Sequence, residues 1–175
     1  DQIEALSLAD QIAVMSAGKI RQVERASLIC QQPDNVFVAG FMGSPPMNLL
    51  RGSLIHSGEG HAFRKGSFSV PLSRVAGYDL TADVPIILGV RPEEVRIGAA
   101  ADTGMAARVL LVEPRGSEAI VTLEASGQII KAVVASDNRP AEGGDVRLEL
   151  DETSLVLFSG ETDRRLPPLA SRAAA

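Results

Sequence analysis

Residues 145–150 read Asp-Val-Arg-Leu-Glu-Leu, and the alternation in this stretch indicates a β-strand. Every second residue is apolar, which is the period of a β-strand that turns one face toward a core and the other toward water. We predict that Val146, Leu148 and Leu150 are buried and that the charged residues between them face solvent. The stretch is therefore expected to be a half-buried strand.

Similar short apolar runs fill most of the chain around this strand, and glycines or acidic residues separate them. Lys65-Gly66 between two such runs is a hairpin signal. Many short strands at turn spacing are typical of a barrel or a sandwich, and a barrel also removes exposed strand edges. Residues 72–78 fit a helical turn, and residues 99–104 fit a loop. Further strands are expected over 48–57, 62–64, 67–70, 84–90, 95–97, 106–113, 118–124, 128–134 and 155–158.

The stretch Gly43-Ser44-Pro45-Pro46 separates this region from a shorter segment of mixed character. Three consecutive positions that disfavour helix indicate a domain boundary after residue 43. Before it we expect a helix over 2–9 capped by Asp1, a hairpin over 12–23 that turns at Gly18, and helical turns over 26–32 and 35–42, the last capped by Asp34. The predicted domains are residues 1–43 and 44–163, followed by a disordered tail over 164–175.

Composition narrows the classes of function. The formal net charge is −5, from 22 acidic and 17 basic side chains, and 3% of residues are aromatic. Neither property suits nucleic-acid binding, which depends on phosphate neutralisation and base stacking. The single cysteine, Cys30, excludes a disulfide framework within the chain and indicates a reducing compartment. No apolar run approaches the roughly 20 residues that span a bilayer, so any membrane association is expected to come through partners.

Two groups of residues could carry chemistry. Arg91, Glu93 and Glu94 follow the predicted strand 84–90, and Pro92 fixes φ for a turn there. We favour a structural interpretation, in which an ion pair closes the turn. His56 and His61 flank a glycine-rich loop, but no cysteine or carboxylate completes a metal-ligand set at characteristic spacing. They are therefore interpreted as surface histidines, and no metal site is predicted.

The run 109–112, Val-Leu-Leu-Val, is apolar on both faces of its predicted strand. Such a strand is either buried on both sides or lies at a contact between subunits. Val109 and Leu111 are therefore candidates for a dimer contact.

The N-terminal stretch resembles the end of the ATP-binding domain of ABC transporter ATPases. In that family a histidine that senses the ATP γ-phosphate precedes Asp-Gln, a short helix, Leu-Ala-Asp, a strand, a glycine turn and a second strand. The matching residues here are Asp1-Gln2, Glu4-Ala5, Leu8-Ala9-Asp10, Gly18 and Gln22. The resemblance implies that Asp1 and Gln2 adjoin the switch histidine and support its loop, although helix capping by Asp1 explains that residue equally well.

Four further motifs resemble the regulatory domain of the ATPases that drive maltose, glycerol-3-phosphate and related importers. They are Phe41-Met42-Gly43-Ser44-Pro45-Pro46-Met47-Asn48, Gly89-Val90-Arg91-Pro92-Glu93, the stretch 109–118 with Glu113 and Gly116, and Leu155-Val156-Leu157-Phe158. That domain contains the TOBE module, an OB-like β-barrel. The expected fold is therefore mainly β, with an OB-like TOBE barrel preceded by a small α/β remnant of the ATPase domain. The motif residues expected to be structural are Gly89, Arg91, Pro92, Glu93, Glu113 and Gly116.

The resemblance implies the C-terminal regulatory and dimerisation part of an importer ATPase. The chain has no Gly-x-x-x-x-Gly-Lys-[Ser/Thr] loop, so we expect it to bind no ATP or other cofactor itself, while ATP and Mg²⁺ belong to the parent chain. The implied partners are a second ATPase subunit, permease subunits and a regulatory protein, without nucleic acid, at the cytoplasmic face of a bacterial membrane. The alternatives are a free-standing OB-like module that binds an oxyanion or a protein, and a scaffold without a ligand.

Overall fold

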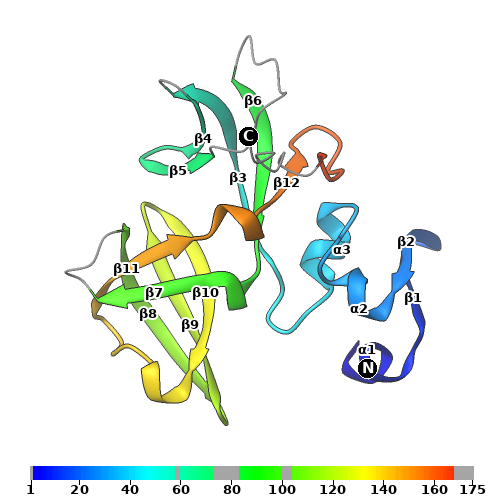
Figure 1. Ribbon diagram of the computed structural model, residues 1–175, viewed down its shortest axis with the longest axis horizontal. Helices are drawn as coiled ribbons and strands as arrows, with labels where there is room; N and C mark the ends of the chain where they lie inside the picture. The colour runs from blue at the N-terminus through cyan, green and yellow to red at the C-terminus, as the bar shows by residue number, and fades with distance from the viewer. Residues whose placement is uncertain (1, 58–59, 73–82, 100–103, 168–175) are drawn as a thin grey trace, which may run out of the picture.

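The computed structural model describes residues 2–57, 60–72, 83–99 and 104–167. A small N-terminal segment, residues 2–42, lies beside two five-stranded sheets (Figure 1). All strand pairs among the described residues are antiparallel. The predictions for Asp1, for most of 72–78 and for 100–103 lie outside the described residues. None of the described helices is long and apolar enough to cross a membrane.

The N-terminal segment combines three short helices with a hairpin. Its elements are α1 (Gln2–Leu8), β1 (Gln11–Ser16), β2 (Lys19–Arg25), α2 (Ala26–Ile29) and α3 (Val36–Phe41). The hairpin turns at Gly18, whose φ of +73° is the left-handed conformation that glycine adopts without steric cost. A small core of Val14, Ile29, Val38 and Met42 joins the hairpin to α2 and α3.

The cap of α3 differs from the prediction. Asn35, not Asp34, is the N-cap residue, and its side-chain oxygen accepts a hydrogen bond of 3.0 Å from the Val38 N–H. The backbone N–H of Asp34 instead donates to the Gln22 side chain at 2.9 Å. Asp34 therefore belongs to the loop before the helix, because the Gln22 contact holds it one residue outside the cap position.

The first sheet has the strand order β12-β6-β3-β4-β5, and the second has the order β10-β9-β8-β11-β7. The strands of the first sheet are β3 (Asn48–Ser57), β4 (Gly60–Lys65), β5 (Phe68–Leu72), β6 (Val84–Val90) and β12 (Val156–Ser159). Those of the second are β7 (Val95–Ala99), β8 (Met105–Arg115), β9 (Glu118–Ala125), β10 (Gln128–Ala135) and β11 (Asp145–Leu150). Three single 3₁₀ turns lie between strands that follow one another in the sequence: η1 (Pro92–Glu94), η2 (Ser136–Asn138) and η3 (Glu152–Ser154).

One hydrophobic core lies between the two sheets and takes side chains from both. It includes Leu54, Phe63, Leu88, Leu123 and Ile130, each nearly inaccessible to solvent. Strand β11 follows most of the predicted alternation: Val146 and Leu148 are buried in this core, whereas Leu150 is only half-buried and packs against it. The mainly β fold expected from the sequence is confirmed.

Strand β8 corrects the prediction for residues 109–112. Val109 is 1% exposed and belongs to the shared core, so it has no surface to offer a partner. Leu110 and Leu111 are each 47% exposed, so the run is not buried on both faces. The pairing with β9 shifts between Val109 and Leu111, as expected for a β-bulge, which places an extra residue on the strand and disturbs strict alternation.

The predicted tail also begins too early. The Leu166 N–H donates to the Leu157 carbonyl at 2.8 Å, and the Arg165 N–H donates to the Asp34 carbonyl at 2.8 Å. Ordered structure therefore continues through Leu166, because the chain after β12 returns along that strand. Residues 168–175 lie outside the described residues.

Candidate functional site: the junction of the N-terminal segment with the sheets

Arg91 lies where the chain leaves the first sheet for the second, between β6 and η1. Its guanidinium donates to the Met42 carbonyl at 2.8 Å and to the Cys30 carbonyl. The predicted ion pair that closes the turn is therefore wrong: no carboxylate lies within 4.0 Å of Arg91 among the described residues. The fork of N–H donors instead ties the start of η1 to the N-terminal segment.

The surroundings of Arg91 affect two titrating groups. Burial lowers the pKa of Arg91, and Cys30 and Glu93 act in the opposite direction. Burial also raises the pKa of the Cys30 thiol; Arg91 opposes this rise and Glu93 adds to it. Gly43, with φ of +108°, lies against the guanidinium, since a Cβ there would be 3.1 Å from Nη1 of Arg91. The partly buried junction therefore has little room for a larger side chain at this glycine.

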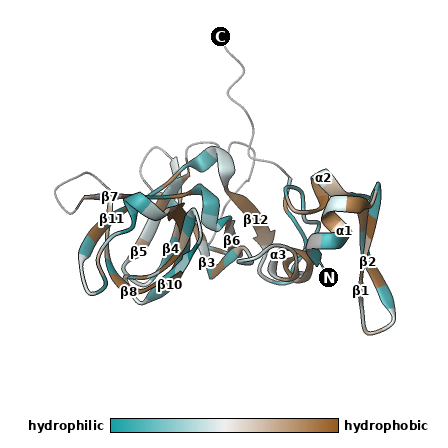
Figure 2. Ribbon diagram, turned by 90° about the horizontal axis from the view of Figure 1, so that it is seen from below, coloured by the Kyte–Doolittle hydropathy of each residue, from teal (hydrophilic) through white to brown (hydrophobic). Residues whose placement is uncertain are grey.

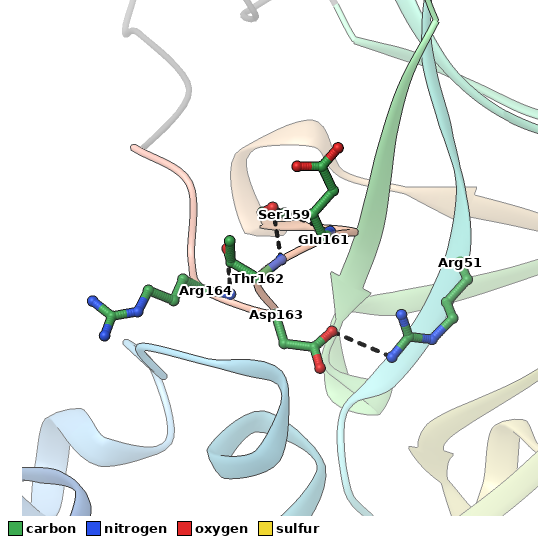
Figure 3. A network of polar contacts seen from close by, with 6 residues as sticks. All are labelled: Arg51, Ser159, Glu161, Thr162, Asp163 and Arg164. Atoms are coloured by element: carbon green, nitrogen blue, oxygen red, sulfur yellow. Dashed lines mark hydrogen bonds and ion pairs between the residues drawn. The ribbon is translucent and has the colours of Figure 1, made fainter.

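The return segment, Ser159–Leu166, forms a second connection at the junction (Figure 3). The Val36 N–H at the start of α3 donates to the Asp163 carbonyl at 2.9 Å, and Asn35 pairs with Arg164 as an isolated bridge. The Asp163 carboxylate lies 3.3 Å from the Arg51 guanidinium on β3. The return segment thus contacts both the N-terminal segment and the first sheet.

The shape of the return segment follows from its sequence, Ser-Gly-Glu-Thr-Asp. The Ser159 hydroxyl accepts from the Glu161 N–H at 3.3 Å and from the Thr162 N–H at 3.2 Å. The Asp163 N–H donates to the Ser159 carbonyl at 3.0 Å. Serine and aspartate stabilise turns through such local bonds. The resulting turn directs Asp163 toward Arg51 (Figure 3).

Apolar packing completes the attachment of α3 to the first sheet. Ala39, Met47, Ile87 and Phe158 are buried together in a cluster that is separate from the shared core. Gly89 leaves room for this cluster, because a Cβ there would lie 2.6 Å from the Met47 sulfur and 3.0 Å from the Phe158 ring. The glycine of the predicted motif is therefore required by close packing.

Asn48 connects the first sheet to the second. Strand β10 is an edge strand of the second sheet. The Lys131 N–H on that edge donates to the Asn48 side-chain oxygen at 2.8 Å, and the Asn48 amide donates to the Lys131 carbonyl at 2.8 Å and to the Val90 carbonyl at 3.2 Å. Asn48 is 9% exposed and thus covers part of a strand edge.

Two glutamines hold the N-terminal segment together. The Gln22 side-chain amide donates to the Gln32 carbonyl at 2.8 Å, and the Gln22 side-chain oxygen accepts from the Asp34 N–H. The Gln2 amide donates to the Phe41 carbonyl at 2.9 Å and so joins α1 to the end of α3. The role of Gln2 beside a switch histidine stays a prediction.

The remaining motif residues occupy turns and strand positions apart from the junction bonds. Pro92 is buried at the first position of η1, and Glu93 is exposed beside it. Glu113 lies on β8 opposite Ile120, and Gly116 forms the β8–β9 turn with φ of +68°. The structural roles expected for these residues stay predictions.

Exposed apolar side chains lie on several elements, including α3, where the Phe37 and Phe41 rings stack. The β1–β2 hairpin projects at one end of the molecule in Figure 2 and carries Met15, Ile20 and Val23 on its surface. In the second sheet, Leu110 and Leu111 are exposed on β8 and Ile129 is exposed on β10. The described ranges hold no group of three or more histidine, cysteine, aspartate or glutamate side chains placed for a metal ion.

A groove of about 1080 Å³ runs beside the return segment and is lined also by β2 and α3. Arg21, Arg164 and Arg165 line it together with Asp34 and Asp163. Asp163 is already paired with Arg51 outside the arginine group. The groove therefore carries charges of both signs and has no strong preference for one sign of ligand.

Two family matches cover the sheets: a MalK OB fold domain over residues 43–95 and a TOBE domain over residues 88–158. A cytoplasmic molybdate-binding protein, ModG, is a solved structure of lower similarity, with a TM-score of 0.48 and 16% identity over 63% of this chain and 94% of that one.

Several curated relatives match nearly the whole chain. The sn-glycerol-3-phosphate import ATP-binding protein UgpC of Jannaschia sp. is 36% identical over 95% of this chain and 45% of its own length. The xylose/arabinose import ATP-binding protein XacK of Haloferax volcanii is 35% identical over 95% of this chain and 45% of its own length. The chain thus spans a little under half the length of the relatives it matches. Residues 43–158 are a MalK OB fold domain followed by a TOBE domain, and the chain belongs with the C-terminal part of import ATP-binding proteins.

Proposed function

We propose that this chain is the regulatory end of an ABC importer ATPase subunit and that the junction couples its ATP-binding part to the sheets. Residues 1–43 would complete the ATP-binding domain, and residues 44–163 would form the regulatory domain. The observation that carries the proposal is Arg91, which starts from the link between the two sheets and binds the Cys30 and Met42 carbonyls of the N-terminal segment.

The geometry supports coupling because the junction has more than one connection. Arg91 holds the ends of α2 and α3, the return segment holds the start of α3, and the apolar cluster packs against its middle. A rotation of the ATP-binding part would therefore carry the sheets with it as one body. Such polar contacts fix the orientation of the N-terminal segment relative to the sheets, while burial of apolar side chains supplies most of the free energy that holds them together.

The parent subunit would bind ATP and Mg²⁺ through residues of its ATP-binding part, and the chain described here would contribute none of those ligands. Its position would be the cytoplasmic side of a membrane, against permease subunits that the parent contacts. A second copy of the subunit and a regulatory protein would be further partners. The exposed apolar pair Leu110 and Leu111 on β8 is the surface that we propose for contact with the second copy.

The coupling proposal is tested in the full-length subunit reconstituted with its permease in proteoliposomes. Arg91→Ala removes both bonds across the junction, and we expect it to lower the amount of solute imported per ATP hydrolysed. Arg108→Ala is the matched control, because Arg108 is an exposed arginine on β8, away from the junction. An unchanged ratio in Arg91→Ala, with normal assembly, would refute coupling through this residue.

The contact between copies is tested separately by sedimentation equilibrium. Leu111→Asp places a charge on the exposed surface of β8 without entering the core, so it should shift the full-length subunit toward monomer. Ile20→Asp on the β1–β2 hairpin is the control, because Ile20 is also an exposed apolar residue but lies in the N-terminal segment. An identical association constant for Leu111→Asp and wild type would remove this surface from the proposal.

A further inference from the structure

His56 and His61, which the sequence predicts to be surface histidines, form a cross-strand pair. They lie directly opposite each other on β3 and β4. Their ring centroids are 5.5 Å apart and the ring planes meet at 80°. His56 is exposed and His61 is half-buried. Directly opposed side chains on neighbouring strands are held close by the strand pairing itself, so the two imidazoles are brought together without a loop having to order.

The residues beneath and beside the pair are apolar. Leu54 and Phe63 form the next cross-strand pair on the same face, two residues away on each strand, and both are fully buried. On the other side of His61, its partner on β5 is the fully buried Leu72. The histidines therefore stand at the rim of the core, with an apolar floor on one side and solvent on the other.

We propose that His56 and His61 form a chelating site for a divalent transition-metal ion of the Zn²⁺ class. Imidazole is a preferred ligand of zinc, nickel and copper. Two imidazoles on one tetrahedral zinc, bound through nitrogens at about 2.0–2.1 Å, have ring centres roughly 5 Å apart, which is close to the separation seen here. The terminal torsion of histidine is broad, so both rings can turn a nitrogen toward one ion without backbone movement.

The site would be open. The described residues supply no third histidine, cysteine or carboxylate ligand in a cluster with the pair. Water would fill the remaining coordination positions, as in sites that keep exchangeable ligands. The bound ion would join β3 to β4 and so stabilise the first sheet at the end far from the junction. This site is independent of the function proposed above.

Isothermal titration of the chain, purified without a histidine tag, with ZnCl₂ tests the proposal. We expect saturable binding of one ion, and no comparable heat with MgCl₂, because Mg²⁺ prefers oxygen ligands. His56→Gln and His61→Gln should each weaken Zn²⁺ binding by about a hundredfold, since the second imidazole binds at the high effective concentration set by the first. Zn²⁺ should also raise the melting temperature of the wild-type chain and of neither variant.

Cys30→Ser is the matched control, because a thiolate also binds Zn²⁺ and Cys30, the one cysteine of the sequence, lies in the N-terminal segment. It should retain full Zn²⁺ binding. His56→Gln changes an exposed side chain, so a loss of binding there does not reflect a damaged core. Binding that persists unchanged in both histidine variants, or that disappears in Cys30→Ser alone, would overturn the proposal, as would the absence of saturable binding.

Discussion

Replacement of Asn48 by alanine tests how the two sheets are held together. Asn48 lies at the start of β3, and its side chain satisfies the Lys131 N–H and carbonyl on the outer edge of β10. It also donates to the Val90 carbonyl at 3.2 Å. Alanine removes all three bonds and leaves two backbone groups of the edge strand without these partners in a nearly dry position.

The expected loss of stability follows from the Lys131 N–H and carbonyl, which lose their partner in Asn48→Ala. Each buried polar group left without a partner costs about 1–3 kcal/mol, and water entering at the rim of β10 recovers part of it. We therefore expect Asn48→Ala to lower the free energy of unfolding by about 2–4 kcal/mol. For a chain of this size, 1 kcal/mol corresponds to roughly 2–4 °C in melting temperature, so the expected decrease is about 4–16 °C.

Thermal and urea unfolding followed by far-ultraviolet circular dichroism measure this change. Asn138→Ala is the control, because Asn138 is an exposed asparagine in η2 and its substitution should change stability by less than about 0.5 kcal/mol. Hydrogen exchange adds a local readout: the Lys131 amide should lose protection in Asn48→Ala and keep it in Asn138→Ala. Equal stability of the two variants would refute the role assigned to Asn48.

Three further outcomes follow from the same structure. Gly89→Ala should lower the free energy of unfolding by about 1–3 kcal/mol through overpacking against Met47. The double variant Gly89→Ala/Met47→Ala should recover part of that loss. Unchanged stability of Gly89→Ala would contradict the close packing. Burial raises the pKa of the Cys30 thiol, so iodoacetamide should alkylate the folded chain at pH 8 more slowly than the urea-unfolded chain. For the same reason the free energy of unfolding should fall as the pH rises past the ordinary thiol pKa of about 8.5. Equal alkylation rates for the folded and unfolded chains would argue against the raised pKa. In Asn48→Asp, a carboxylate would face the Val90 and Lys131 carbonyls, so the pKa of the new carboxyl should be raised. The free energy of unfolding of the variant, relative to wild type, should therefore fall as the pH rises from 4 to 7. A difference that does not depend on pH would show that the carboxylate has turned toward solvent.

The strands could be predicted from sequence because their signals are local. The alternation of residues 145–150 and the continuous apolar run 84–90 each specify a strand without knowledge of its neighbours. The β-bulge at Val109 could not be predicted in this way. It depends on how β8 pairs with β9, and it decides which of four consecutive apolar residues are buried.

The junction could be predicted only in part. The motif around Arg91 marked an important residue, but its acceptors are backbone carbonyls 49 and 61 positions away, and carbonyl positions leave no trace in a residue pattern. An ion pair with nearby glutamates was the simplest local alternative and was wrong. The return segment had a usable signal, because Ser-Gly-Glu-Thr-Asp at 159–163 is a turn composition that argues against a tail beginning at residue 164.

Contacts between side chains on different strands could not be predicted from sequence for a related reason. Asn48 ends the motif of residues 41–48, yet its function depends on β10 being an edge strand. His56 and His61 are opposed only because β3 and β4 pair in the register that joins Ser57 to Gly60. Register is a property of two strands together, so one-dimensional spacing could not place these side chains.

We propose that this chain is the C-terminal part of an import ATP-binding protein. Sequencing of the genomic region upstream of the codon for Asp1 tests this proposal. We expect one open reading frame that continues upstream through a P-loop, a signature motif and a Walker B strand, with a histidine codon immediately before Asp1. A reading frame that begins at or close to Asp1, with no ATP-binding motifs before it, would contradict the claim.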